Sequence, residues 1–194
     1  IVVDRTVKGE FENYQTPEGE VPATQLDIPW ETCYSLYGWG WRKGATLKSS
    51  KKVLAVLIEV VAKGGNFLLG VGPKPDGTIE EQAVDRVTTI CKWLDKNGEA
   101  IYATVNARKY NDGNVWFTQS KDGKKMYAMY ALKEDDPEVP AVIEWTGNIP
   151  AGKKVTLLST GKRVKCEVDG DRVKVYLPKH VDRTESLAFS FGIK

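Results

Sequence analysis

Residues 49–71 read SSKKVLAVLIEVVAKGGNFLLGV, a pattern that predicts a helix followed directly by a strand. Ser49 or Ser50 can cap the helix, and the apolar residues that follow recur at helical spacing. Gly64-Gly65 ends it, because glycine readily adopts the left-handed conformation that closes many helices. Phe67 to Val71 is then a short apolar run typical of a buried strand.

Two earlier segments also predict strands. Ile1 to Asp4 opens on apolar β-branched residues and indicates a buried strand, and Leu26 to Tyr34 is the second candidate. The polar, turn-rich stretch from Lys8 to Pro22 is predicted to be a long loop, and Tyr37 to Gly44 a loop rich in glycine and aromatic residues. Because a buried strand needs neighbours on both sides, we expect the chain to be the C-terminal part of a longer protein.

A second helix follows the strand at Phe67 to Val71. The turn at Pro73 to Gly77 separates them, and Thr78 with Glu81 matches a capping box at the helix start. Asn97-Gly98 is predicted to end this helix. Its apolar face is expected to consist of Val84, Val87, Cys91 and Leu94.

The predicted secondary structure changes after about one hundred residues, from alternating strands and helices to strands alone. Alternating strands and helices are typical of a parallel sheet covered by helices, and two helices cannot close a barrel alone. From Ala103 onward, short alternating strands and three Asp-Gly turns indicate an antiparallel β-sandwich. The predicted fold class is therefore α/β followed by all-β, with domains at residues 1–102 and 103–194 and a linker around Glu99 to Lys109. The turns are Asp112-Gly113, Asp122-Gly123 and Asp169-Gly170.

Composition removes several classes of function. The 28 Lys and Arg residues nearly balance the 26 Asp and Glu residues, and the net charge of +2 predicts no nucleic-acid partner. The most apolar run, Val53 to Ala62, contains Glu59 and is far shorter than the roughly 20 residues of a membrane span, so we predict no membrane partner. The 3 cysteines are widely spaced and His180 is the single histidine, which predicts neither metal nor other cofactor and leaves hydrolytic chemistry to carboxylates.

Three features are candidates for a site. The loop from Gly9 to Glu20 holds four carboxylates and two aromatic residues, which suits sugar binding and acid catalysis but also a solvated acidic loop. The loop from Tyr37 to Arg42 carries Trp39 and Trp41 between glycines, as either a stacking platform or a packed surface loop. Arg5 follows the first strand and either positions a ligand or forms a structural ion pair with the adjacent aspartate.

A series of short motifs along the chain closely resembles, in sequence and in order, the motifs of the α-L-fucosidases of glycoside hydrolase family 29. The motifs extend over about residues 1 to 102, and the β-rich half is similar to the C-terminal sandwich domain of that family. Gly70 departs from the pattern, because many relatives carry Asn there. The motifs are Val3-Asp4-Arg5, Tyr14-Gln15-Thr16-Pro17-Glu18, Trp30-Glu31-Thr32-Cys33, Trp39-Gly40-Trp41, Lys63 through Leu69, Gly72-Pro73, Asp76-Gly77, Trp93-Leu94 and Asn97 through Tyr102.

The resemblance implies the last βα units of a (β/α)8-like barrel followed by a β-sandwich. It also implies an enzyme, a retaining exo-glycosidase that removes terminal α-L-fucose through a covalent intermediate on an Asp nucleophile. Glu18 aligns with the acid/base, with Glu12 and Glu20 as competitors, Arg5 with an arginine near the fucose ring, and Trp39 with an aromatic residue at the apolar face of the sugar. The family's nucleophile lies on an earlier strand, so we expect residues 1–194 alone to be inactive.

The same resemblance implies further partners and a location. A fucosylated glycan is the expected substrate, and the missing N-terminal part of the barrel is the expected structural partner. Export from a bacterial cell, or a lysosomal location for an animal enzyme, follows by analogy. A different class of function stays open, in which the β-rich half is a non-catalytic carbohydrate-binding or structural module.

Overall fold

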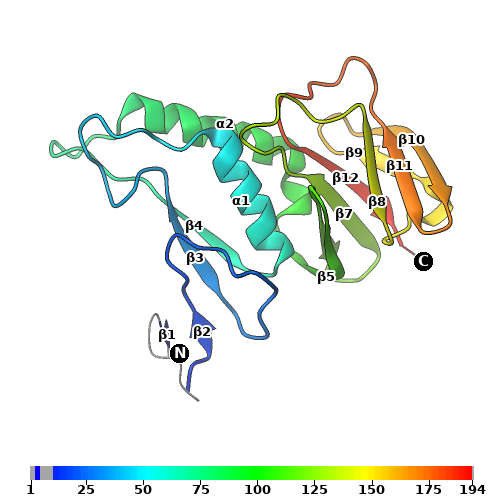
Figure 1. Cartoon of the computed structure of the whole chain (residues 1–194), viewed down its shortest axis with the longest axis horizontal. Helices are drawn as coiled ribbons and strands as arrows, with labels where there is room; N and C mark the ends of the chain where they lie inside the picture. The colour runs from blue at the N-terminus through cyan, green and yellow to red at the C-terminus, as the bar shows by residue number, and fades with distance from the viewer. Residues whose placement is uncertain (1–2, 5–10, 194) are drawn as a thin grey trace.

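Four short strands near the N-terminus pair in parallel, in the order in which they occur along the chain (Figure 1). A computed structural model describes residues 3–4 and 11–193. The strands are β1 (Val3–Asp4), β2 (Tyr14–Gln15), β3 (Glu31–Ser35) and β4 (Asn66–Gly70). β1 pairs with β2 and β3 with β4, while bridges from Gln15 to Trp30 and from Glu18 to Cys33 join the two pairs. The predicted parallel arrangement is confirmed.

The strand boundaries differ from the sequence prediction in two places. The segment Lys8 to Pro22, predicted as loop throughout, contains β2, and the strand expected from Leu26 begins only at Glu31. The polar segment that holds β2 is a strand because it pairs with β1 rather than because of an apolar pattern, and Pro29, which has no backbone N–H for a sheet hydrogen bond, lies just before β3. Val3 is 49% exposed rather than buried, because within the described residues β1 has a partner on one side only. Ile1 and Val2 lie outside the described residues.

Helix α1 (Ser50–Ala62) connects β3 to β4 and begins as predicted. The Ser49 hydroxyl accepts a hydrogen bond from the Lys52 N–H at 3.0 Å, which caps the first turn. Gly64 has a φ of +80°, so the chain leaves the helix through a left-handed residue. The buried side chains of α1 include Val53, Leu57 and Ile58, which follow the predicted helical spacing.

Helix α2 (Glu81–Asn97) ends where predicted but begins differently. Its N-cap residue is Glu80, without a side-chain cap, and Thr78 donates its N–H and hydroxyl to Asp76 instead, so the predicted capping box is wrong. An Asx-type turn two residues earlier satisfies the threonine and removes it from the helix. The predicted apolar face is correct only in part: Val87 and Leu94 pack against the core, but Val84 and Cys91 are exposed. The buried residues are Ala83, Ile90, Trp93 and Asn97.

The β-rich half is one antiparallel sheet of eight strands in the order β5-β6-β7-β12-β9-β10-β11-β8. The Asp-Gly turns at Gly113, Gly123 and Gly170 form hairpins as predicted, each with positive φ. The strands are β5 (Thr104–Asp112), β6 (Val115–Ser120), β7 (Lys125–Tyr130), β8 (Val142–Thr146), β9 (Val155–Leu157), β10 (Lys162–Asp169), β11 (Arg172–Tyr176) and β12 (Leu187–Gly192).

This sheet folds over on itself around a shared core. Lys162–Val164 of β10 pair with β9, and Lys165–Asp169 pair with β11, so this strand passes from one part of the sheet to the other. Phe117 from β6 and Trp145 from β8 meet edge to face at 5.9 Å inside the fold. The two end strands are joined through side chains, because Asp112 of β5 accepts hydrogen bonds from Thr146 of β8. The sheet is therefore nearly closed.

Helix α1 lies between the parallel strands and the folded sheet, and α2 crosses its upper end in this view (Figure 1). A second core combines their apolar faces with Tyr127 and Met129 of β7 and Ala188 of β12, all buried. A 3₁₀ turn, η1 (Gly98–Ala100), leads almost directly into β5, so most of the linker predicted around Glu99 to Lys109 is regular structure. Among the described residues no helix is long and apolar enough to cross a membrane.

Candidate active site

The candidate site is a cavity of about 890 Å³ at the carboxyl ends of β3 and β4. It is formed by the loop after β2, the end of β3, the loop that follows it, the start of α1 and the turn after β4. A second cavity, of about 660 Å³, lies beside Gly64, Gly65 and β5 and contains none of the predicted site residues. The first cavity is lined by Glu18, Gly19, Cys33, Tyr34, Ser35, Gly38, Trp39, Gly40, Lys48, Lys52, Leu68, Gly70, Val71 and Gly72.

Glu18 is placed in this cavity by its pairing with β3. The Cys33 N–H donates to the Pro17 carbonyl at 3.1 Å, and the Gly19 N–H donates to the Cys33 carbonyl at 2.9 Å. Residues paired across a sheet point to the same face, so the side chain of Glu18 lies on the face of Cys33 and away from the buried Tyr34. An exposed carboxylate on this face can meet a ligand in the cavity.

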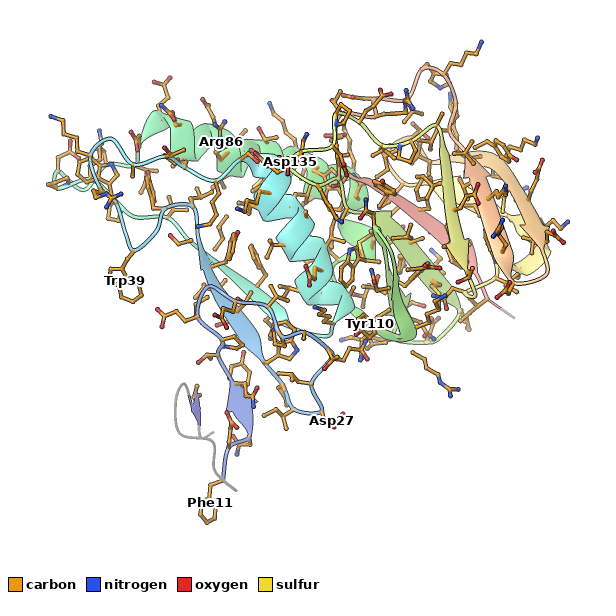
Figure 2. All side chains as sticks on the ribbon, viewed as in Figure 1. Phe11, Asp27, Trp39, Arg86, Tyr110 and Asp135 are labelled. Carbon is orange, nitrogen blue, oxygen red and sulfur yellow. The ribbon has the colours of Figure 1, made fainter. Side chains whose placement is uncertain are left out.

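Trp39 projects from the loop that follows β3 and is 86% exposed (Figure 2). The base of this loop is fixed: the Leu36 N–H donates to the Gly70 carbonyl at 3.1 Å, and the buried Tyr37 donates its hydroxyl to Glu80 at 3.0 Å. Burial, more than the neighbouring carboxylate, raises the pKa of Tyr37 above its ordinary value, so it remains a neutral donor. An indole held in water on a fixed loop is available to stack on a ligand ring.

Lys48 fixes the start of the same loop through hydrogen bonds to main-chain carbonyls. Its ammonium donates to the Ser35 carbonyl at 2.6 Å and the Tyr37 carbonyl at 2.8 Å, and lies 4.8 Å from the centre of the Tyr34 ring. Burial, and then the nearby charge of Lys52, lower the pKa of Lys48. The lysine therefore ties the end of β3 to the start of the aromatic loop while facing the cavity.

The structure brings together two of the three predicted site residues, Glu18 and Trp39, on one cavity. Arg5 lies outside the described residues. Of the competing carboxylates, Glu12 precedes β2 and accepts a hydrogen bond from Gln15 at 3.1 Å, and the carbonyl of Glu20 accepts one from Thr32 at 2.7 Å. Neither lines this cavity.

Sequence reasoning missed the two lysines and Cys33. No sequence motif singles out Lys48, which stands in a polar stretch. Its position is set by main-chain carbonyls at the end of β3 and just beyond it, and these carry no sequence signal. Lys52 stands beside Lys51 at a helix start, where paired lysines usually face solvent. Cys33 could have been placed, because it alternates with the buried Thr32 and Tyr34 in β3.

The chain resembles known proteins along most of its length. The family model described as Alpha-L-fucosidase matches residues 1–99. The chain is 33% identical over 181 residues to the tissue alpha-L-fucosidase of Bos taurus and 30% identical over 182 residues to that of Homo sapiens. Both alignments cover 89% of this chain and 38% of the relative. Alpha-L-fucosidase isoenzyme 1 from Paenibacillus thiaminolyticus superposes with a TM-score of 0.80 at 26% identity, covering 94% of this chain and 45% of that one.

Proposed function

The chain belongs to the α-L-fucosidase family, and from this premise we propose that it forms part of a retaining exo-glycosidase that removes terminal α-L-fucose from glycans. It spans 38% of the length of the curated relatives it matches, so the activity of the whole protein is a proposal for this chain. The observation that carries the proposal is the single cavity shared by Glu18 and Trp39. A carboxyl group beside an exposed aromatic ring suits glycoside hydrolysis.

We interpret the parallel strands as the last part of a (β/α)8-like barrel, comprising residues 1–102, with residues 103–194 as a β-sandwich domain. The strands are neighbours in chain order, as in such barrels, and the cavity is at their carboxyl ends, where barrel enzymes hold their sites. Val3 and Leu68 are 49% and 50% exposed on the open face of these strands. Further strands would cover apolar side chains of this kind.

In the proposed mechanism Glu18 acts first as acid and then as base. Its carboxyl group donates a proton to the glycosidic oxygen while an aspartate nucleophile attacks the anomeric carbon, which breaks the glycosidic bond and forms a covalent fucosyl ester. The Glu18 carboxylate then takes a proton from water, which attacks the same carbon and releases fucose with retained configuration. The two carboxyl groups of such a pair lie about 5 to 5.5 Å apart.

The nucleophile is expected on a barrel strand that precedes this chain, so residues 1–194 alone should not hydrolyse fucosides. In the complete enzyme Trp39 would cover the apolar face of fucose, because sugar C–H groups pack well on an indole. Arg5 would contact the ring region of the sugar with its guanidinium group. No cofactor enters this scheme. An exported or lysosomal location stays a proposal by analogy.

A bracing role for the β-rich half is favoured over an independent carbohydrate-binding module. Its strands β7 and β12 bury one face against α1 and α2 through Tyr127, Met129 and Ala188. A module that worked alone would expose this apolar face to water, at a cost of about 25 cal/mol per Å². The contact therefore fits a domain that supports the helices behind the proposed site.

The test is replacement of Glu18 in the full-length protein. Glu18→Gln should lower kcat/KM for an unactivated fucoside by a factor on the order of 100 to 10,000, the usual contribution of a general acid/base. In Glu18→Ala, added azide should restore turnover of an aryl fucoside and yield fucosyl azide, because azide attacks the intermediate without needing a base. The matched control is Glu12→Gln, which should retain activity. Unchanged turnover in Glu18→Ala would remove Glu18 from the mechanism.

A further inference from the structure

Two lysines line the cavity that holds Glu18 and Trp39. Lys48 and Lys52 both face it, and the single carboxylate among its described lining residues is Glu18. The chain as a whole carries a net charge of only +2, so a general excess of lysine does not explain this pair. A general acid carries its proton when it meets its substrate, and at that stage the described wall of the cavity holds two positive charges and no negative one.

Beside its contact with the Tyr34 ring, the ammonium group of Lys48 keeps one N–H that makes no hydrogen bond to a described residue. It has three N–H groups, and its hydrogen bonds within the described residues go to the carbonyls of Ser35 and Tyr37. Burial and the nearby charge of Lys52 both lower its pKa, which means that the folded protein holds this cation at a cost. A bound anion in the cavity would offset that cost and accept the remaining hydrogen bond.

Lys52 differs from the lysine next to it. Lys51 donates to the carbonyls of Glu134 and Asp136, at 3.4 and 2.9 Å, and is therefore committed to the loop after β7. Lys52 is exposed in the first turn of α1, and its ammonium group has no ion pair or hydrogen bond among the described residues. The two neighbours on one helix thus have separate surroundings, and Lys52 alone of the two faces the cavity.

We propose that Lys48 and Lys52 form a binding site for an anionic group on the leaving group of the substrate, so that the preferred substrates are fucosides of acidic glycans. The inference rests on the proposed function, because the acid Glu18 must touch the glycosidic oxygen and the leaving group therefore occupies the same cavity. The chemistry required is an oxyanion, either a sulfate ester or the carboxylate of an acidic sugar.

The experiment compares matched substrates in the full-length protein. One pair is an aryl α-L-fucoside with a ring carboxylate and its methyl ester, and the other has a ring sulfonate and the corresponding sulfonamide. For each pair the quantity measured is the ratio of kcat/KM for the anionic substrate to that for the neutral one, in the unaltered protein, Lys52→Gln and Lys51→Gln. Differences in leaving-group chemistry cancel when these ratios are compared between proteins.

Lys52→Gln should lower the ratio roughly fivefold, the effect of one charge pair near a protein surface, and Lys51→Gln should leave it unchanged. Added salt should reduce the ratio in the unaltered protein and have less effect in Lys52→Gln. A larger drop for the sulfonate pair than for the carboxylate pair would identify sulfate esters as the source. Equal ratios in all three proteins would overturn the inference and leave the hydrolase standing, whereas no turnover of any substrate by the unaltered protein would instead remove the proposed function.

Discussion

Gly72 packs against the aromatic loop so closely that no other residue fits. A Cβ atom at this position would lie 2.3 Å from the Trp41 nitrogen and 2.9 Å from the Gly40 carbonyl carbon. Both are main-chain atoms, which cannot move aside as the end of a flexible side chain can. Gly72→Ala should therefore displace the loop that carries Trp39 and lower the free energy of unfolding by about 1 to 3 kcal/mol. Urea denaturation of the chain measures this loss.

The matched control is Gly70→Ala, two residues earlier at the end of β4. A Cβ atom there would meet the Tyr34 carbonyl at 3.5 Å, an ordinary contact, and the glycine has no positive φ. The alanine should change stability by less than about 0.5 kcal/mol. If Gly70→Ala proved as destabilising as Gly72→Ala, the close approach at Gly72 would not be the cause.

At the residue scale, the sequence predicted side chains whose type and neighbours already suggest chemistry. Glu18 and Trp39 stand in loops with aromatic and glycine residues, and the structure brings both to one cavity. Lys48 could not be found this way, because its hydrogen-bond partners are main-chain carbonyls 13 and 11 residues away, at the end of β3 and just beyond it. The role of Glu18 itself stays a prediction until the substitution is measured.

At the scale of single elements, the apolar face of α2 shows where a sequence pattern fails. Val84, Val87, Cys91 and Leu94 repeat at helical spacing, but the face that packs is displaced by about one residue and centres on Ile90 and Trp93. Which face of a helix is buried depends on the element that packs against it. For α2 that element is a sheet formed by residues far along the chain. Periodicity therefore predicted the helix correctly and its orientation only in part, since Val87 and Leu94 pack against the core while Val84 and Cys91 are exposed.

Trp93 anchors α2 to the segment that leads into β12. Its indole Nε1–H donates to the Ser186 carbonyl at 2.6 Å, and the side chain is 1% exposed. Trp93→Phe leaves that carbonyl without its donor and opens space beside it, which should cost about 1 to 3 kcal/mol in the free energy of unfolding. Chemical denaturation followed by far-ultraviolet circular dichroism measures the effect without relying on tryptophan fluorescence.

Cys91→Ser is the control for this helix. Cys91 is exposed two residues before the tryptophan, so its replacement should change stability by less than about 0.5 kcal/mol. A large loss of stability in this variant would mean that the exposed face of α2 is covered in solution. Cys91→Ser could then no longer serve as the control for Trp93→Phe. Equal stability of Trp93→Phe and the unaltered chain would show that the buried hydrogen bond contributes nothing.

At the scale of the whole molecule, long-range contacts determine the order of the strands and the packing of the helices, which local sequence patterns do not predict. Each of the three Asp-Gly turns correctly predicted a hairpin, because a hairpin is encoded by its own few residues. The order of the eight strands is not encoded locally: β12 lies between β7 and β9, and β8 pairs with β11. Nor does a local pattern reveal that α1 and α2 pack on this sheet, and a linker was predicted where the chain runs almost directly from η1 into β5.

The nearly closed sheet is held at its two ends by Asp112, and this contact should make stability depend on pH. The Asp112 carboxylate of β5 accepts hydrogen bonds from the Thr146 N–H and hydroxyl of β8, each at 2.7 Å, and lies 3.3 Å from the Lys109 ammonium. The Thr146 hydroxyl, the Thr146 N–H and Lys109 outweigh burial and hold the pKa of Asp112 below its ordinary value. The folded state therefore favours the ionised form more than the unfolded state does.

It follows that the contribution of Asp112 is fully present above the pKa of the unfolded carboxyl and is lost as the pH falls through the lower pKa of the folded one. Asp112→Asn should be less stable than the unaltered chain by about 1 kcal/mol at pH 7, because an amide accepts these hydrogen bonds more weakly. The difference should shrink as the pH is lowered, since the unaltered chain then loses the same charge. Asp95→Asn, on the exposed face of α2, should show no such difference at any pH. A constant gap between Asp112→Asn and the unaltered chain down to acid pH would mean that the carboxylate charge does not hold the ends of the sheet together.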